Sequence, residues 1–104
     1  MAKLVNNFVM KGNQSNQYKV VVATRKEFFA VRDDICDCHL CGDEVDLDDE
    51  MFYIPVLDVV YCRRCYELWC ISVQYFKVDK PIEDKNLKNI VEKFEELGCW
   101  DENN

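Results

Sequence analysis

The chain has 104 residues, 49% of them apolar, and a formal net charge of −7. This length suits one domain spanning residues 1–104, and the chain lacks a run of about eighteen apolar residues that could cross a membrane. The N-terminal segment also lacks the long apolar stretch of a secretory signal, so we expect a cytoplasmic, intracellular protein with reduced cysteines.

The charge is unevenly distributed along the chain. Residues 1–35 carry six basic and three acidic side chains, whereas residues 36–61 carry eight acidic side chains and no Lys or Arg. An acidic segment repels phosphates and attracts basic surfaces, so the middle of the chain suits a basic protein partner better than a nucleic acid. The simplest alternative is an acidic loop that only contacts solvent.

Residues 1–35 are predicted to form an N-terminal arm and a β-hairpin. Leu4–Val5 and Phe8–Met10 suit a short strand or a docking arm, and the polar residues 12–17 suit a loop. The runs Tyr18–Ala23 and Phe28–Val31 are β-branched or aromatic and are separated by four polar residues. We therefore expect them to pair as the two strands of the hairpin.

Residues 36–76 hold a second hairpin and a helix. An acidic loop covers residues 43–50, and Met51–Ile54 and Val59–Tyr61 are predicted strands on either side of Pro55. Apolar residues then recur at helical spacing from Cys65 to Phe76.

Residues 77–104 are predicted to form a C-terminal helix and tail. The helix should run from Asp84, as its N-cap, to Leu97, with Gly98 ending it. A core-facing stripe is expected from Ile82, Leu87, Ile90, Val91, Phe94 and Leu97. The predicted fold class is α+β.

Four cysteines have the spacing of a zinc site. Cys38 and Cys41 form one Cys-x-x-Cys pair, Cys62 and Cys65 form another, and twenty residues lie between the pairs. A two-residue gap lets both sulfurs of a pair face one metal, and Gly42 can take the positive φ that such a turn often requires. The sequence therefore predicts one structural Zn²⁺ held by these four residues. Arg63 and Arg64 would offset part of the negative charge of the thiolates.

The remaining cysteines and the single histidine are not expected to be zinc ligands. Cys36 lies too close to Cys38 for good chelate geometry, although it could compete as a ligand. Cys70 falls on the predicted helix and should be buried, while Cys99 should be a free or half-buried thiol. His39 could replace a sulfur, but a solvent-facing position in the turn is the simpler expectation.

The order of these features resembles the treble-clef zinc-finger superfamily, which includes LIM-like fingers. The features are a turn ending in Cys41-Gly42, a hairpin over residues 52–61, and Cys62-x-x-Cys65 opening a helix. The resemblance covers residues 36–76 and implies a small treble clef with a structural metal, but no particular function. In size and style, the chain is also similar to small accessory proteins of phages and mobile elements.

A closed four-sulfur site is structural, because catalytic zinc sites keep one position open. We therefore expect a non-enzymatic, protein-binding module, whose acidic surface could inhibit a nucleic-acid-handling enzyme. The predicted partner surface comprises Asp43, Glu44, Asp46, Asp48, Asp49, Glu50 and an exposed aromatic edge at Phe52 and Tyr53. The alternative is a nucleic-acid binder that uses basic residues gathered opposite the acidic loop, namely Arg25, Lys26, Arg32, Arg63 and Arg64.

Overall fold

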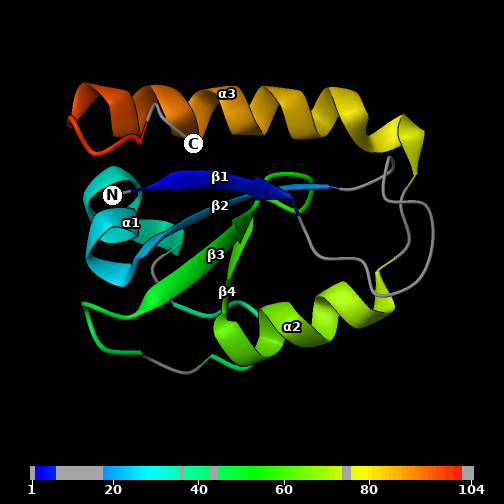
Figure 1. The fold of residues 1–104 in the computed structure, drawn as a ribbon, viewed down its shortest axis with the longest axis horizontal. Helices are drawn as coiled ribbons and strands as arrows, with labels where there is room; N and C mark the ends of the chain where they lie inside the picture. The colour runs from blue at the N-terminus through cyan, green and yellow to red at the C-terminus, as the bar shows by residue number, and fades with distance from the viewer. Residues whose placement is uncertain (1, 7–17, 36, 43–44, 74–75, 102–104) are drawn as a thin grey trace.

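A computed structural model of the chain describes residues 2–6, 18–35, 37–42, 45–73 and 76–101. The elements in chain order are β1 (Lys3–Asn6), β2 (Lys19–Thr24), α1 (Arg25–Val31), the 3-10 turn η1 (Asp33–Ile35), β3 (Glu50–Ile54), β4 (Val59–Cys62), α2 (Arg63–Ser72), the 3-10 turn η2 (Lys77–Asp79) and α3 (Lys80–Glu96). The four strands form one antiparallel sheet in the order β1-β2-β3-β4. α3 runs along one side of this sheet, and α2 packs against β3 and β4 on the other (Figure 1). The fold is the small α+β domain that the sequence predicts.

β2 lies inside the sheet and is buried along most of its length. Val20, Val21 and Ala23 are almost inaccessible to solvent, which agrees with a β-branched run that packs on both faces. β1 pairs with one edge of β2, with Val5 opposite Val20, and β3 pairs with the other, with Tyr53 opposite Val21. The sheet therefore joins the N-terminal segment to the β3–β4 hairpin.

The hairpin predicted within residues 18–31 is wrong in its second strand. The antiparallel partners of β2 are β1 and β3, and neither includes Phe28–Val31, which belongs to α1. β1 confirms a strand at Leu4–Val5. Thr24 and Glu27 form a capping box, in which the Thr24 hydroxyl accepts from the Glu27 N–H at 3.2 Å and Glu27 Oε1 accepts from the Thr24 N–H at 3.0 Å. These two bonds start a helix where the aromatic run alone suggested a strand. The strand or arm expected at Phe8–Met10 and the loop at residues 12–17 lie outside the described residues.

The β3–β4 hairpin is confirmed. Phe52 lies opposite Tyr61, and Ile54 lies opposite Val59, with Pro55 in the connecting turn. Asp58 closes this turn with a positive φ of 55°, and its backbone N–H donates to the carbonyl of Ile54 at 2.8 Å.

Both predicted helices exist, with shifted ends. α2 begins at Arg63 rather than Cys65 and ends at Ser72 rather than Phe76. α3 begins at Lys80, so Asp84 lies inside the helix and does not cap it. Asp79 takes the N-cap position and Pro81 lies in the first turn, where a missing N–H costs no helical hydrogen bond. Gly98 follows the helix with a φ of 71°, as predicted.

The apolar stripe of α3 is buried only in its centre. Ile90 and Phe94 are almost fully buried, and the Phe94 ring packs edge-on against Phe28 of α1 at 5.6 Å between centroids. Ile82 and Leu97, at the two ends of the predicted stripe, are instead about half exposed. α3 therefore contributes its middle turns to the core beside α1 and β2.

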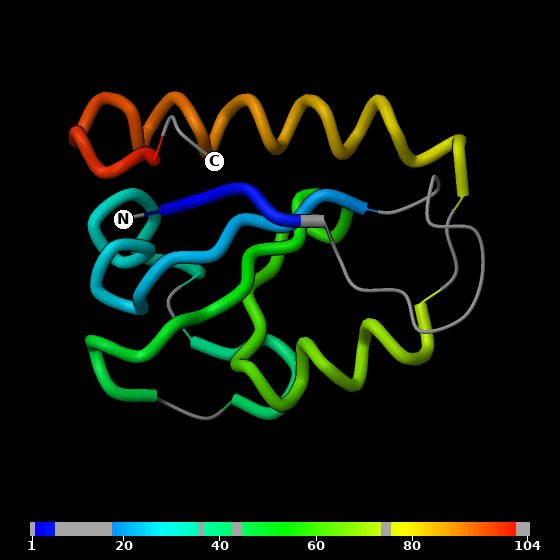
Figure 2. Tube along the Cα trace, viewed as in Figure 1, coloured from blue at the N-terminus to red at the C-terminus, as the bar shows by residue number. Residues whose placement is uncertain are grey.

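The described ends of the chain lie close together (Figure 2). The Ala2 N–H donates to the Cys99 carbonyl at 2.7 Å, and the Asp101 N–H donates to the Ala2 carbonyl at 2.8 Å. The thiol of Cys99 is half-buried, as predicted. Within the described residues, no helix is both long enough and apolar enough to cross a bilayer.

Candidate metal centre

The four cysteine sulfurs predicted as ligands come together in the structure. The Sγ atoms of Cys38, Cys41, Cys62 and Cys65 all lie within 4.8 Å of one another, and the Cys41 and Cys62 sulfurs are 3.9 Å apart. Four sulfurs at about 2.3 Å from one tetrahedral Zn²⁺ would be separated by about 3.8 Å, whereas a disulfide requires about 2.05 Å. The arrangement therefore fits a four-sulfur metal site better than a disulfide between Cys41 and Cys62.

The first pair of sulfurs lies in a tight turn fastened to the sheet. The Gly42 N–H donates to the Cys38 carbonyl at 2.9 Å, and Gly42 has the predicted positive φ, at 73°. The backbone N–H of His39 donates to the Val60 carbonyl at 2.8 Å, which ties the turn to β4. The His39 side chain is exposed, as expected for a residue that is not a ligand.

The second pair lies where β4 becomes α2. Cys62 is the last residue of β4 and the N-cap of α2, and Cys65 follows in the first turn of the helix. The Cys62 side chain makes no capping hydrogen bond in the described structure, so its sulfur remains available to a metal. Both sulfurs of this pair therefore come from the junction between β4 and α2.

Two of the four thiols have pKa values shifted in opposite directions by their surroundings. Burial by itself would raise the pKa of Cys38, but backbone N–H groups of Cys41, Cys62 and Leu40 donate to its sulfur and lower the pKa to about 6. Burial and hydrogen bonds among the four sulfurs raise the pKa of Cys65 to about 12. A metal that binds here would therefore displace protons from part of the cluster.

Arg63 lies beside the site, but its charge is shared with an acidic residue. Its guanidinium pairs with Glu50 at 2.8 Å and lies over the Phe52 ring, 5.1 Å from the centroid. Arg64 is exposed and makes no ion pair within the described residues. The predicted compensation of the thiolate charge by Arg63 is therefore weakened by Glu50.

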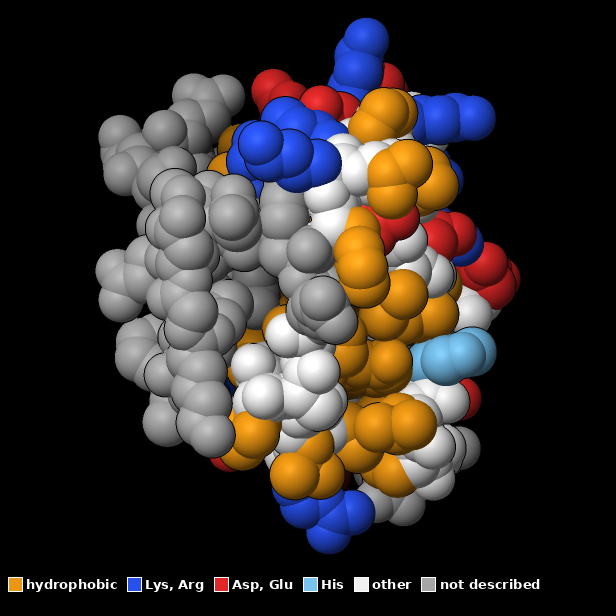
Figure 3. All heavy atoms as spheres, turned by 90° about the vertical axis from the view of Figure 1, so that its right-hand side faces the viewer, with side chains coloured by type: hydrophobic (Ala, Val, Ile, Leu, Met, Phe, Trp, Pro, Cys, Tyr) orange, Lys and Arg blue, Asp and Glu red, His pale blue; other side chains and the backbone are white. Residues whose placement is uncertain are grey.

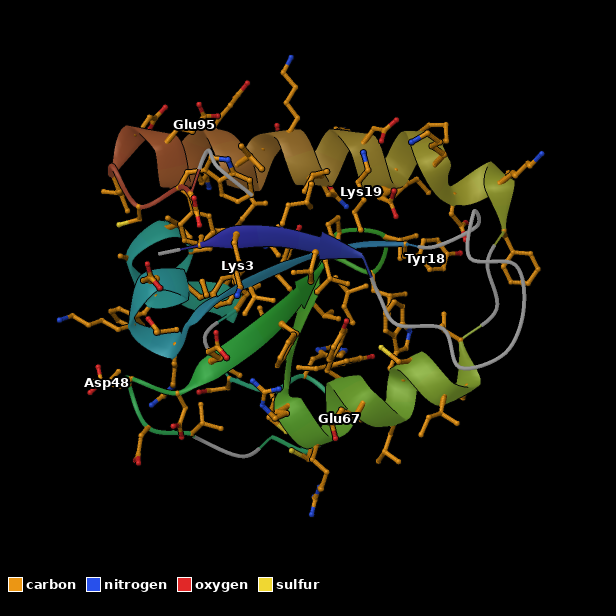
Figure 4. All side chains as sticks on the ribbon, in the orientation of Figure 1. Lys3, Tyr18, Lys19, Asp48, Glu67 and Glu95 are labelled. Atoms are coloured by element: carbon orange, nitrogen blue, oxygen red, sulfur yellow. The ribbon has the colours of Figure 1, made fainter. Side chains whose placement is uncertain are left out.

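The predicted partner surface is only partly present. Asp46, Asp48, Asp49 and Glu50 are exposed, and Asp48 points outward (Figure 4). Asp43 and Glu44 lie outside the described residues, as does Cys36.

The expected exposed aromatic edge at Phe52 and Tyr53 is wrong, because both side chains are at least 95% buried. Phe52 stacks on Tyr66 of α2 at 4.1 Å between centroids, and Tyr53 packs against Phe28 at 6.4 Å. β3 is an interior strand with neighbours on both sides, so its side chains enter the core.

The basic residues of the alternative function do not gather opposite the acidic loop. The backbone N–H groups of Arg25 and Lys26 donate to the carbonyls of Asp49 and Leu47, which places the start of α1 against that loop. Three of the five guanidinium or ammonium groups are also engaged within the chain. Arg25 pairs with Asp37, Arg32 pairs with Asp34 and Asp58, and Arg63 pairs with Glu50.

A polar network on the α3 side of the sheet has no counterpart in the sequence prediction. Asp58 accepts from Arg32 Nη1 at 2.6 Å and from the Tyr53 hydroxyl at 2.5 Å, and burial with this hydrogen bond raises the pKa of Tyr53. The three residues border a hollow of about 430 Å³ beside α3. The two charged groups of the network, Arg32 and Asp58, pair with each other, so we assign the network a structural role.

Cys70 does not join the metal centre; it is buried on α2, as predicted. Among the described residues, the four clustered cysteines are the group of His, Cys, Asp or Glu side chains able to hold a metal. The assignment of the site depends on this geometry alone, since no protein-family model, curated protein or solved structure matches the chain.

Proposed function

We propose that the chain is a non-enzymatic, intracellular protein-binding module built around one structural Zn²⁺. The observation that carries the proposal is the gathering of four cysteine sulfurs within 4.8 Å. A cysteine turn, the β3–β4 hairpin and a helix opened by Cys62 follow one another in the order typical of a treble clef. We therefore interpret residues 36–76 as a treble-clef finger.

The donor set favours zinc and a structural role. Four sulfurs in a tetrahedral arrangement suit Zn²⁺ or iron, and a Cys₄ zinc site leaves no position for a reacting water. When bound, the metal supplies a cross-link among the cysteine turn, β4 and α2. Cys38 and Cys41 would fix the turn, while Cys62 and Cys65 would fix the direction in which α2 leaves the sheet.

The acidic loop supports a basic protein as the partner. Four exposed carboxylates lie within residues 46–50, one before and three after Leu47, which is itself about half exposed. Carboxylates arranged in this way can replace phosphates on the surface of a nucleic-acid-handling enzyme, and the loop would then inhibit that enzyme.

The first experiment measures metal content on the purified full-length chain. Native mass spectrometry and elemental analysis should give one Zn²⁺ per chain, and the protein should be colourless, unlike an iron site. A chain that carries no zinc when purified and binds none on titration would refute the proposal.

The second experiment tests whether the acidic loop binds a basic protein. Asp46→Lys/Asp48→Lys should abolish capture of basic proteins from a cytoplasmic extract, since neither side chain supports the loop through a hydrogen bond in the described structure. Glu95→Lys/Glu96→Lys makes the same charge change on α3, where Glu95 points away from the sheet, and should leave capture intact (Figure 4). Binding of DNA or RNA at low salt by the wild-type chain would instead support the nucleic-acid alternative.

A further inference from the structure

The four cysteines of the metal centre differ in their access to solvent. Cys41 is exposed, whereas Cys38, Cys62 and Cys65 are each at most 9% exposed. Cys41 belongs to a turn in which residues 39–42 are all exposed. The one histidine of the chain, pale blue in Figure 3, stands out into solvent from this turn. A small solute that approaches the centre from water therefore meets Cys41 before the other three cysteines.

A second sulfur lies close to that of Cys41. The Sγ atoms of Cys41 and Cys62 are 3.9 Å apart, and they come from separate segments, the cysteine turn and the junction between β4 and α2. A disulfide bond is about 2.05 Å long, so the two sulfurs would have to approach by about 1.9 Å. Rotation of the Cys41 side chain about its Cα–Cβ bond moves the sulfur by a distance of this order.

We propose that the metal centre is a redox switch, in which a hydroperoxide oxidises Cys41 and Cys62 to a disulfide and the zinc leaves. This inference rests on the proposed function, because it requires that the four sulfurs hold zinc. Zinc keeps its cysteine ligands deprotonated, and the thiolate is the form that attacks peroxides. An accessible thiolate beside a second sulfur is the arrangement of a redox-sensing cysteine and its resolving partner.

The oxidation proceeds in two steps. The Cys41 thiolate attacks one oxygen of hydrogen peroxide, an S–O bond forms, the O–O bond breaks, and hydroxide leaves with a proton from solvent as water. The Cys62 thiolate then attacks the sulfur of the Cys41 sulfenic acid. An S–S bond forms, the S–O bond breaks, and a second hydroxide leaves as water. The two sulfurs lose two electrons in total, and the peroxide takes up these electrons and two protons.

The disulfide takes two of the four ligands from the metal. Cys38 and Cys65 alone cannot complete a four-coordinate site, so the zinc passes into solvent. The disulfide joins the cysteine turn to the junction between β4 and α2, the same two segments that the zinc joins. A dithiol such as dithiothreitol breaks the disulfide by exchange and restores the four thiols, so the chain regains its zinc.

The test uses the purified full-length chain loaded with zinc and treated with hydrogen peroxide. A zinc-binding dye should report the release of one zinc per chain. Mass spectrometry of a non-reduced digest should show the Cys41–Cys62 disulfide. Dithiothreitol followed by added zinc should restore the original metal content.

Two variants test the role of Cys41. Histidine is the fourth ligand of Cys₃His zinc sites, so Cys41→His keeps four ligands but lacks the exposed sulfur. The zinc that this variant holds should leave at least about tenfold more slowly in peroxide than the zinc of wild type. Cys99→Ser removes a half-buried thiol outside the cluster and should release zinc at the wild-type rate. The disulfide map of wild type decides the same question without either variant.

The metal content before peroxide separates the two proposals. A chain that holds no zinc at this stage refutes the metal centre and the switch together. A chain that holds zinc and keeps it, at a peroxide concentration that fully oxidises free glutathione, refutes the switch alone. Zinc release that yields a Cys38–Cys41 or Cys62–Cys65 disulfide, or sulfinic acids that dithiothreitol does not reverse, would also overturn the switch.

Discussion

The substitution Cys38→Ser separates a metal ligand from an ordinary buried cysteine, because Cys70 provides a matched control. Both thiols are at least 95% buried, and both become hydroxyls. Cys38 lies in the four-sulfur cluster, whereas Cys70 lies on the inner side of α2 outside it. Any difference between the two variants therefore reports on the role of the sulfur in the cluster.

The expected losses in free energy of unfolding differ clearly between Cys38→Ser and Cys70→Ser. A structural zinc contributes about 10–16 kcal/mol of apparent binding free energy, so an even share among four sulfurs is about 3 kcal/mol each. A domain of this length has a free energy of unfolding of about 5–15 kcal/mol, and a loss of about 3 kcal/mol lowers the melting temperature by about 15 °C. Cys70→Ser should cost about 1 kcal/mol, because a buried helical hydroxyl can donate to the carbonyl four residues earlier.

Thermal unfolding by circular dichroism, with and without a chelator, measures these effects, and elemental analysis gives the zinc content. Wild type and Cys70→Ser should both hold one zinc and both lose stability when the metal is removed. Cys38→Ser should melt far lower and respond little to the chelator. If the two variants melt together and retain equal zinc, Cys38 is not a ligand and the proposed centre is wrong.

Three further predictions test individual residues by thermal or chemical unfolding. Gly42→Ala should cost about 1 kcal/mol from its positive φ alone, since a Cβ there would meet no atom within 4 Å. Tyr18→Phe should cost about 2 kcal/mol, because the hydroxyl donates to Asp79 and accepts from the Phe76 N–H. Burial raises the pKa of Tyr18 from 10.0 to about 12, so the wild type should lose stability as the pH rises through this window and the variant should not. Burial also raises the pKa of Glu83 above its value in the unfolded chain. The protonated side chain therefore stabilises the fold at low pH, and this contribution is lost as the pH rises through the folded pKa. The variant Glu83→Gln, which cannot ionise, should therefore gain more stability over wild type at pH 7 than at pH 4.

The metal centre was the most predictable part of the molecule, because the spacing of the cysteines within each short pair is enough to indicate it. A two-residue gap between Cys38 and Cys41 restricts the turn enough that both sulfurs face one point, and Cys62 and Cys65 repeat the pattern. The β3–β4 hairpin between the pairs then brings them together. Spacing alone could therefore predict the site without knowledge of any other contact.

A strand was wrongly predicted at residues 28–31, because the aromatic and β-branched side chains were given more weight than the helix-capping residues before them. Phe28-Phe29-Ala30-Val31 has the composition of a strand, yet Thr24 and Glu27 form a capping box that was visible in the sequence. Phe28 is buried, while Phe29 and Ala30 are both exposed; an alternating strand would bury Ala30 again, so the burial pattern does not fit a strand. The stronger local signal was the cap.

Contacts between distant segments could not be predicted in the same way. Glu83 precedes Leu87, Ile90 and Phe94 at helical spacing, so its position on the buried side of α3 was visible in principle. A charged residue is nonetheless normally assigned to solvent. Its partner, the backbone N–H of Lys19 at 3.1 Å, belongs to a strand 64 residues earlier and is fixed only when α3 packs along β2.

The two sides of the sheet therefore depend on different interactions, and this links the metal to the proposed surface on the acidic loop. On one side, the aromatic contacts of Phe94 with Phe28 hold α3 and α1 without any cysteine of the cluster. On the other, the orientation of α2 follows from Cys62 and Cys65 at its first turn, with the stacking of Tyr66 on Phe52. The acidic loop leads from the cysteine turn into β3, the strand that carries Phe52. A metal at the four sulfurs would thus set the position of the acidic loop relative to α2.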